Sequence, residues 1–211
     1  MTLRADKLTC VRGERQLFSG IGFDINPGEA LRVVGTNGSG KTSLLRMLCG
    51  LAHPAEGEVR WHGNNIRVLR DEYCRNLIYI GHANGVKDDL LAWENIVVAS
   101  TLSGKPVNRA DAAHALEQLG LGRAAELPTR SLSQGQRKRV ALARLQLGMA
   151  TPLWILDEPF TALDQSAVTE LCSTLNNHLA GGGMVIYTTH QEIDLTARRS
   201  FRLDLNRSTL C

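Results

Sequence analysis

The residues whose types and spacing most clearly indicate a chemical role form a glycine-rich loop at positions 35–42. This loop follows the pattern G-x-x-x-x-G-K-[ST] and lies between an apolar strand pattern at 31–34 and a helical pattern at 42–51. In such a loop, backbone N–H groups wrap a phosphate at the positive end of the following helix. Lys41 then reaches the β- and γ-phosphates, and the Thr42 hydroxyl is a ligand for Mg²⁺. The sequence therefore predicts that ATP and Mg²⁺ bind through Gly35, Thr36, Asn37, Gly38, Ser39, Gly40, Lys41 and Thr42.

Three further polar residues follow two apolar runs in the second half of the chain. Asp157 and Glu158 come directly after the run 153–156, which is typical of a strand buried on both faces. A carboxylate at that position can hold Mg²⁺ directly or through water, and we assign this role to Asp157. Glu158 is then placed to polarise an attacking water as a general base. His190 follows the apolar run 184–189, and an imidazole there is placed to sense the γ-phosphate, because ligands of open α/β sheets bind at the carboxyl ends of strands.

Each of these residues also has a plain structural interpretation. A pair of acids at a strand end is often only solvated, and a lone histidine is more often structural than functional. The phosphate loop in the same chain favours the functional interpretation of all three.

A third motif, Leu-Ser-Gln-Gly-Gln at 132–136, precedes a helix rich in arginine and lysine. Ser133 is a natural N-cap, and the backbone at Gly135 can approach an anion closely. The start of such a helix offers unpaired N–H groups to a phosphate. Taken alone, however, this motif predicts only a capped basic helix.

The elements that must position these motifs alternate between strand and helix. Short strands are predicted in 1–34, at 59–61 and at 77–80, whereas helical patterns dominate 84–150. One of these helices has Asn108 as its N-cap, Gly120 as its stop and one apolar face formed by Ala113, Leu116 and Leu119. The pattern predicts one α/β domain over 1–211, with a core of 1–83 and 151–211. A helical subdomain, about 84–150, carries the motif at 132–136.

Composition excludes several other classes of protein. The net charge of +3 is too small to indicate nucleic-acid binding. The apolar runs fall far short of the ~20 residues that a membrane-spanning helix needs, and the N-terminal residues lack a signal-peptide core. Five scattered cysteines without a Cys-x-x-Cys pair predict reduced, packing thiols rather than a metal or disulfide framework. We therefore expect a protein on the cytosolic side.

The order of these motifs resembles that of the ABC ATPases over nearly the whole chain. The resemblance implies an α/β P-loop NTPase of the ABC type, in which two copies pack head to tail and each ATP lies between them. Carried over, Ser133, Gly135 and Gln136 contact the ATP of the second copy, and the segment 162–164 links the two sites. The resemblance also implies integral membrane subunits as partners, engaged by the helical subdomain.

The particular residues in these motifs are similar to those of one branch of the family, the ATPase subunits of bacterial cytochrome c maturation systems, or haem exporters. The similarity rests on 17–20, on Ile-Gly-His at 80–82, on 154–162 and on 188–191. It implies a peripheral ATPase at the cytoplasmic face of the inner membrane, whose ATP turnover frees a haem-loaded periplasmic chaperone. Two alternatives remain open: a transporter ATPase for another cargo, and a soluble ABC ATPase acting on nucleic acid or the ribosome. Against the second stand the single ATPase domain and the lack of heptads between 41 and 131.

Two positions depart from the family pattern. Ala83 stands where the family usually has a glutamine that helps to hold Mg²⁺ and couples to the membrane subunits. Alanine has no ligand atom, so this contact is lost, supplied by water or taken by a neighbour. Arg12 lies near the place where an aromatic ring commonly stacks on adenine. Its guanidinium group can stack on the base, or it is a solvated loop charge.

Overall fold

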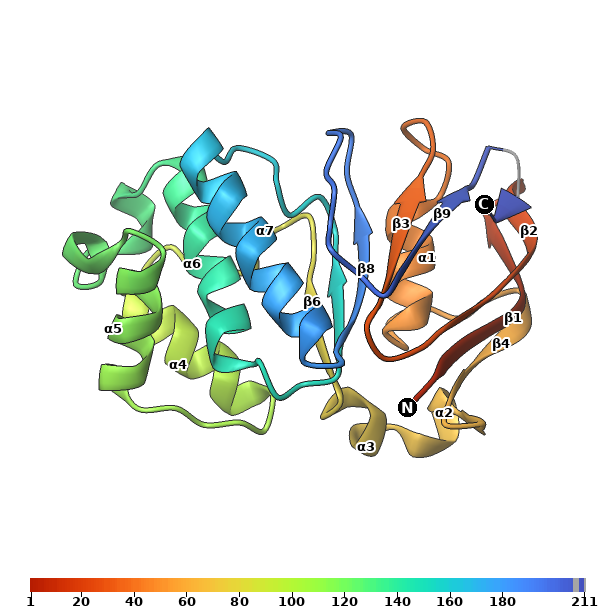
Figure 1. Ribbon diagram of the computed structural model, residues 1–211, viewed down its shortest axis with the longest axis horizontal. Helices are drawn as coiled ribbons and strands as arrows, with labels where there is room; N and C mark the ends of the chain where they lie inside the picture. The colour runs from red at the N-terminus through yellow and green to blue at the C-terminus, as the bar shows by residue number, and fades with distance from the viewer. Residues whose placement is uncertain (207–208, 211) are drawn as a thin grey trace.

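A computed structural model describes residues 1–206 and 209–210 of the chain, which form two sheets and a helical region (Figure 1). Four of the five cysteines lie in the described part and are free thiols, and Cys211 lies outside it. Within the described ranges, none of the helices combines the length and apolar character needed to cross a bilayer.

The first sheet is antiparallel and has the strand order β2-β1-β4-β5. The strands β1 (Leu3–Arg12) and β2 (Arg15–Ile25) form a long hairpin, and β4 (Glu56–Trp61) and β5 (Asn64–Asn65) continue the sheet. Only short strands were predicted in 1–34, and that prediction was wrong for this hairpin. Shifts of register along β1 interrupt the strict alternation of buried and exposed residues by which a long strand is recognised.

The second sheet holds the predicted core strands and has the order β10-β9-β3-β8-β7-β6. Four of the pairings in this sheet of the described residues are parallel, and at one edge β10 runs antiparallel to β9. The strands β7 and β8 are buried along their whole length, as their apolar runs predict. The bounds are β3 (Glu29–Val34), β6 (Leu77–Ile80), β7 (Leu153–Leu156), β8 (Met184–Thr188), β9 (Arg199–Asp204) and β10 (Thr209–Leu210).

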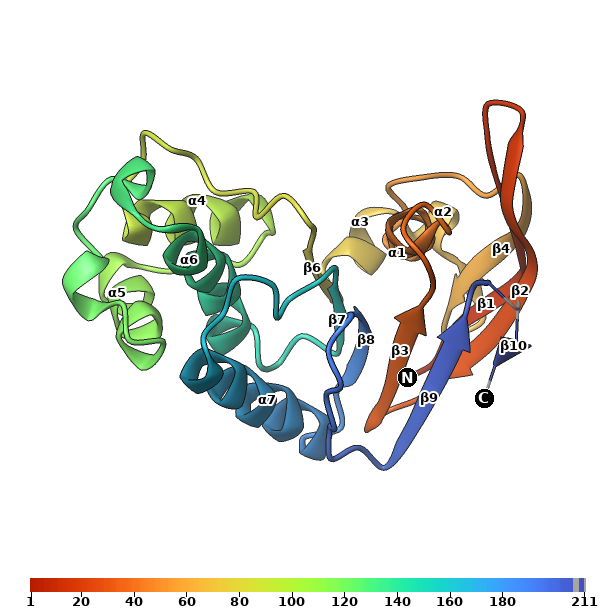
Figure 2. The same cartoon turned by 90° about the horizontal axis from the view of Figure 1, so that it is seen from above.

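The helix α1 (Lys41–Leu48) lies between the two sheets (Figure 2). Its buried Leu44 and Leu45 belong to a core that also contains Leu3 of β1 and Leu31 of β3. The helix ends at Leu48, three residues before its predicted end, because Gly50 takes a left-handed φ of +75°. Two short helices, α2 (Ile66–Leu69) and α3 (Asp71–Cys74), connect the first sheet to β6.

The other face of the six-stranded sheet is covered by α7 (Gln165–Ala180), whose Leu171, Leu175 and Leu179 pack in a core with Val185 and Tyr187 of β8. This core continues into the helical region on the left of Figure 1. That region consists of α4 (Ala92–Leu102), α5 (Arg109–Gln118), the short turns η1 (Gly122–Ala124) and η2 (Thr129–Ser131), and α6 (Gln134–Leu147).

The helix α5 begins and ends close to the predicted signals. The Asn108 side chain accepts a hydrogen bond from the Asp111 N–H, which caps the helix start. The helix stops at Gln118, two residues before the left-handed Gly120. Its buried face contains Ala112, Ala115 and Leu116, so the predicted Ala113 is at the edge of the apolar face.

One buried histidine of α7 yields a prediction about pH. His178 is 2% exposed and stacks on Trp154 with ring centroids 3.7 Å apart, and its burial lowers its pKa from 6.5 to about 4. Between these values the unfolded chain binds a proton that the folded chain does not. Stability should therefore fall as the pH drops from 6.5 to 4, by about 3 kcal/mol from this residue alone.

Urea unfolding of the wild type and of His178→Phe at several pH values measures this effect. The two proteins should show the same slope of unfolding free energy against pH from 8 to 9, where His178 is almost entirely neutral in both states. Below pH 6.5 the wild type should lose stability more steeply than the variant. Equal slopes throughout would contradict a depressed pKa at His178.

Candidate nucleotide site

The phosphate loop is shaped by two glycines in left-handed conformations, with φ of +80° at Gly38 and +103° at Gly40. A Cβ atom on Gly40 would lie 2.9 Å from the ring of Phe18, so this position has room for glycine alone. Lys41 opens α1 and folds back over the loop, where its Nζ donates to the carbonyl of Gly35 at 2.8 Å and of Thr36 at 3.3 Å. The loop therefore places an ammonium group and the N-terminus of α1 on one small concave surface.

A buried carboxylate lies next to this loop. Asp157 is 2% exposed, and its Oδ2 accepts a hydrogen bond of 2.7 Å from the Thr42 hydroxyl. Its Oδ1 accepts a second bond, of 2.8 Å, from the hydroxyl of Thr188 on β8. The Thr188 oxygen in turn accepts from the N–H of Glu158 at 2.8 Å. A hydroxyl oxygen next to a carboxylate is the kind of donor set that Mg²⁺ prefers, so these residues fit the predicted ion.

Glu158 is held in an unusual state for a carboxylate. Its backbone has a left-handed φ of +50°, and its Oε1 is buried without a hydrogen-bond partner among the residues that the structure describes. The His190 ring lies beside that oxygen, with its Nε2 3.5 Å away. Strain and an unsatisfied buried acceptor are both costly, and they are retained where function needs them. The free oxygen is available to a water molecule or to a substrate.

These side chains line one cleft of about 590 Å³. The cleft contains the predicted Arg12, Asp157, Glu158 and His190 together with six loop residues, Thr36, Asn37, Gly38, Gly40, Lys41 and Thr42. Gly35 and Ser39 do not line it; they pack against each other, since a Cβ on Gly35 would overlap the Ser39 side chain. Its polar lining and position at the carboxyl ends of β3, β7 and β8 suit a phosphate-bearing ligand.

The cleft also contains residues that the sequence interpretation missed. His82, which follows β6, lines it, whereas Ala83 does not. Thr161 lines it too, and Thr188 lies behind it as the second partner of Asp157. In the sequence, these residues could be found only by their position next to a motif. Thr188 is two residues before His190, and His82 directly precedes Ala83, which stands in place of the family's usual glutamine.

The motif at 132–136 is called the signature below. Its predicted ATP-contacting residues Ser133, Gly135 and Gln136 do not line this cleft. Ser133 caps α6: its Oγ accepts from the Gln136 N–H at 3.2 Å, and the Gln136 side chain accepts from the Ser133 N–H at 2.9 Å. A Cβ on Gly135 would lie 2.5 Å from the carbonyl oxygen of Ala162, which itself has a φ of +64°. Glycine is thus required here by the packing of α6 on the segment after Glu158.

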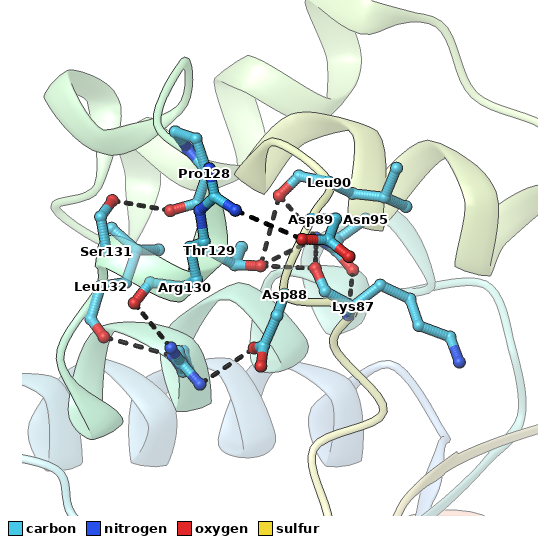
Figure 3. Close-up of polar contacts among 11 residues, drawn as sticks. Lys87, Asp88, Asp89, Leu90, Asn95, Pro128, Thr129, Arg130, Ser131 and Leu132 are labelled. Atoms are coloured by element: carbon cyan, nitrogen blue, oxygen red, sulfur yellow. Dashed lines mark hydrogen bonds and ion pairs between the residues drawn. The ribbon is translucent and has the colours of Figure 1, made fainter.

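The signature is anchored by the loop that follows β6, as Figure 3 shows. The buried Thr129 donates through its hydroxyl to the carbonyl of Lys87 at 2.6 Å, and the Arg130 N–H donates to the carbonyl of Asp88 at 3.0 Å. Arg137 on α6 binds the Asp88 carboxylate at 3.0 Å and donates to the carbonyl of Arg130 at 2.8 Å. The segments 87–91 and 128–132 are therefore joined directly in front of Ser133.

The fold and the cleft together define an ATP-binding cassette of an ABC transporter. The ABC transporter family profile matches residues 18–161 of the chain. A solved dimeric bacterial ABC transporter cassette is 25% identical and superposes with a TM-score of 0.81, covering 96% of this chain and 94% of that one. These findings confirm the predicted class of ATPase and its fold.

Relatives define the branch of the family. The protein of Nitrosospira multiformis is 53% identical over 97% of this chain and 98% of its own length, and that of Nitrosomonas europaea is 54% identical over 90% and 89%. Both are named cytochrome c biogenesis ATP-binding export protein CcmA. The chain belongs to this family, as the residues in its motifs predict.

The contact of Gly135 with Ala162 generates a prediction about the isolated chain. Gly135→Ala should lower the free energy of unfolding in the absence of nucleotide by about 1–3 kcal/mol, because the added methyl group overlaps a backbone oxygen. Thermal or urea unfolding of the single chain measures it. A matched control is Gly22→Ala, where the nearest atom to the new Cβ is 3.7 Å away. Equal stability of Gly135→Ala and wild type would show that Gly135 is not required for internal packing.

Proposed function

We propose that this chain is the ATP-hydrolysing subunit of a membrane complex for cytochrome c biogenesis, with the cleft around Lys41 and Glu158 as its catalytic site. The observation that carries the proposal is the buried, unpaired Oε1 of Glu158 next to His190 and next to the hydroxyl–carboxylate pair of Thr42 and Asp157. A nucleotide-binding loop alone supports binding. A free buried carboxylate oxygen at its side supports hydrolysis.

The loop residues bind the triphosphate. The N–H groups at the start of α1 point at its oxygens, and the Nζ of Lys41 exchanges its two carbonyl partners for the β- and γ-phosphates. Thr42 and Asp157 are the residues that would hold Mg²⁺, which neutralises charge on the phosphates when bound. Thr188 keeps the Asp157 carboxylate in its orientation. Arg12, at the edge of the cleft, is placed to stack on the base.

Glu158 and His190 act at the γ-phosphate. The Oε1 of Glu158 accepts a proton from the attacking water and orients that water toward phosphorus. His190 lines the same cleft, and its Nε2, 3.5 Å from that oxygen, is placed to donate to a γ-phosphate oxygen. His82, also in the lining, is the neighbour that supplies a polar group where Ala83 does not.

The second half of each site comes from a second copy of the chain. Ser133, Gly135 and Gln136 lie outside the cleft of their own subunit, and a related solved cassette is a dimer. In the first turn of α6, the N–H groups of Gln134 and Gly135 have no partner within the helix. These donors are the ones offered to the γ-phosphate of the other subunit's ATP, while the Ser133–Gln136 cap holds the turn in shape.

The membrane partners follow from the relatives. The relatives are named ATP-binding export proteins of cytochrome c biogenesis, and an export function supports integral membrane proteins as partners. We therefore infer that the chain acts with such proteins at the cytoplasmic face of the inner membrane. Closure of the ATP-bound dimer then moves those subunits, and hydrolysis resets them, which frees a haem-loaded periplasmic chaperone. Haem itself does not contact this chain.

Substitution of the catalytic base tests the site. Glu158→Gln should bind ATP with wild-type affinity, form a stable ATP-bound dimer and hydrolyse ATP about 10²–10⁴ times more slowly, because the amide cannot accept the proton. Gel filtration with ATP and a phosphate-release assay measure both effects. Glu170→Gln, at an exposed position of α7, is the control and should behave as wild type. Hydrolysis by Glu158→Gln at the wild-type rate would refute the assignment of the base.

Affinity capture from detergent-solubilised membranes tests the biological role. The tagged chain should recover integral membrane proteins that handle haem, and an untagged strain serves as the control. Recovery of a permease for another cargo would contradict the cytochrome c assignment. Recovery of RNA or DNA without any membrane protein would instead support the soluble alternative.

A further inference from the structure

An arginine outside the cleft contacts the turn that follows His190. Arg32 lies on β3, which runs parallel to β8 with Arg32 opposite Tyr187. Its Nη2 donates to the backbone carbonyl of Gln191 at 2.8 Å, and its Nη1 contacts the Glu192 carboxylate at 3.0 Å. The arginine thus reaches from the strand before the phosphate loop to the residues directly after His190.

The guanidinium group of Arg32 is largely removed from water, so it depends on these two contacts for hydrogen-bond acceptors. Its side chain is 17% exposed, and within the described part of the chain its buried Nε has no hydrogen-bond partner. A cation removed from water needs compensating acceptors, and those that the structure provides are on the 191–192 turn. The Glu192 side chain is 94% exposed, so the Gln191 carbonyl is the better fixed of the two partners.

His190 itself has few restraints on its side chain. The ring side chain is 61% exposed, and its contact with Glu158, at 3.5 Å, is longer than a good hydrogen bond. Its backbone is fixed on both sides: the buried Thr189 accepts through its hydroxyl from the Gln191 N–H at 3.0 Å, and Arg32 holds the Gln191 carbonyl. The direction of the imidazole is therefore set by the turn, and the turn is held by Arg32.

We propose that Arg32 is a positioning residue for ATP hydrolysis, which holds the turn after His190 so that the imidazole faces the γ-phosphate. The proposal rests on the role of His190 given above. Arg32 does not line the cleft, so it has no part in binding ATP. Its loss should change the rate of hydrolysis and leave the affinity for nucleotide unchanged.

A double-mutant cycle on the complex purified from membranes tests this inference. Arg32→Ala should lower kcat about tenfold with KM for ATP unchanged, because a small misplacement of a catalytic group costs rate rather than binding. In the His190→Ala background, Arg32→Ala should have no further effect on kcat, since the group that it positions is absent. Arg32→Lys keeps a cation in the fold but cannot bridge both partners, and it should show the same dependence on His190 with a smaller loss.

The control is Arg202→Ala. Arg202 lies on β9 in register with Arg32 and is exposed, so its loss removes a neighbouring cation and should leave kcat unchanged. Wild-type kcat in Arg32→Ala, or losses that multiply in the double mutant, would overturn the positioning role and leave the proposed function intact. Wild-type kcat in His190→Ala would refute the assigned role of His190, and the inference with it.

Discussion

The carboxylate of Asp157 is the interaction on which the site depends. Its two oxygens accept hydrogen bonds from Thr42 and Thr188, which belong to α1 and β8, while Asp157 itself directly follows β7. One buried carboxylate thus joins the helix of the phosphate loop to β7 and β8, two neighbouring strands inside the sheet. An ionised group in such a place is stable only when its oxygens are paired, so the three elements must meet with little freedom. The same arrangement fixes the backbone of Glu158, because its N–H donates to the Thr188 hydroxyl.

The helix α6 is joined to the rest of the chain by contacts of a different kind. The helix α6 meets the segment after Glu158 through backbone, where Gly135 lies against Ala162. On its other side, α6 is tied to the loop after β6 through Arg137, Asp88 and Thr129. Because His82 lies at the beginning of that loop and lines the cleft, the same covalent segment connects the cleft with the motif at 132–136. The alanine at position 83, in place of the family's usual glutamine, does not interrupt this connection along the chain.

Much of the fold and site was predictable because their residues carry local signals. The phosphate loop, the fully apolar strands β7 and β8, the cap at Asn108 and the acids after β7 each follow from residue type and spacing. The extent of β1 and β2 was not predictable, since bulges break their periodicity. β9 was missed because its sequence, Arg-Ser-Phe-Arg-Leu-Asp, is mostly polar, and it becomes a strand by pairing with β3.

The sequence by itself determined the class of this protein and its reactive groups: a glycine-rich phosphate loop, two acids after a buried strand and a histidine after the next, in the order of an ABC ATPase. Only the tertiary structure decided how these groups are held, because the partners come from distant positions. Thr188 binds Asp157 across 31 residues, and Arg32 reaches Gln191 across 159. Neither contact has a local pattern. Each arises because parallel strands far apart in the chain end at the same edge of the sheet, where their side chains converge.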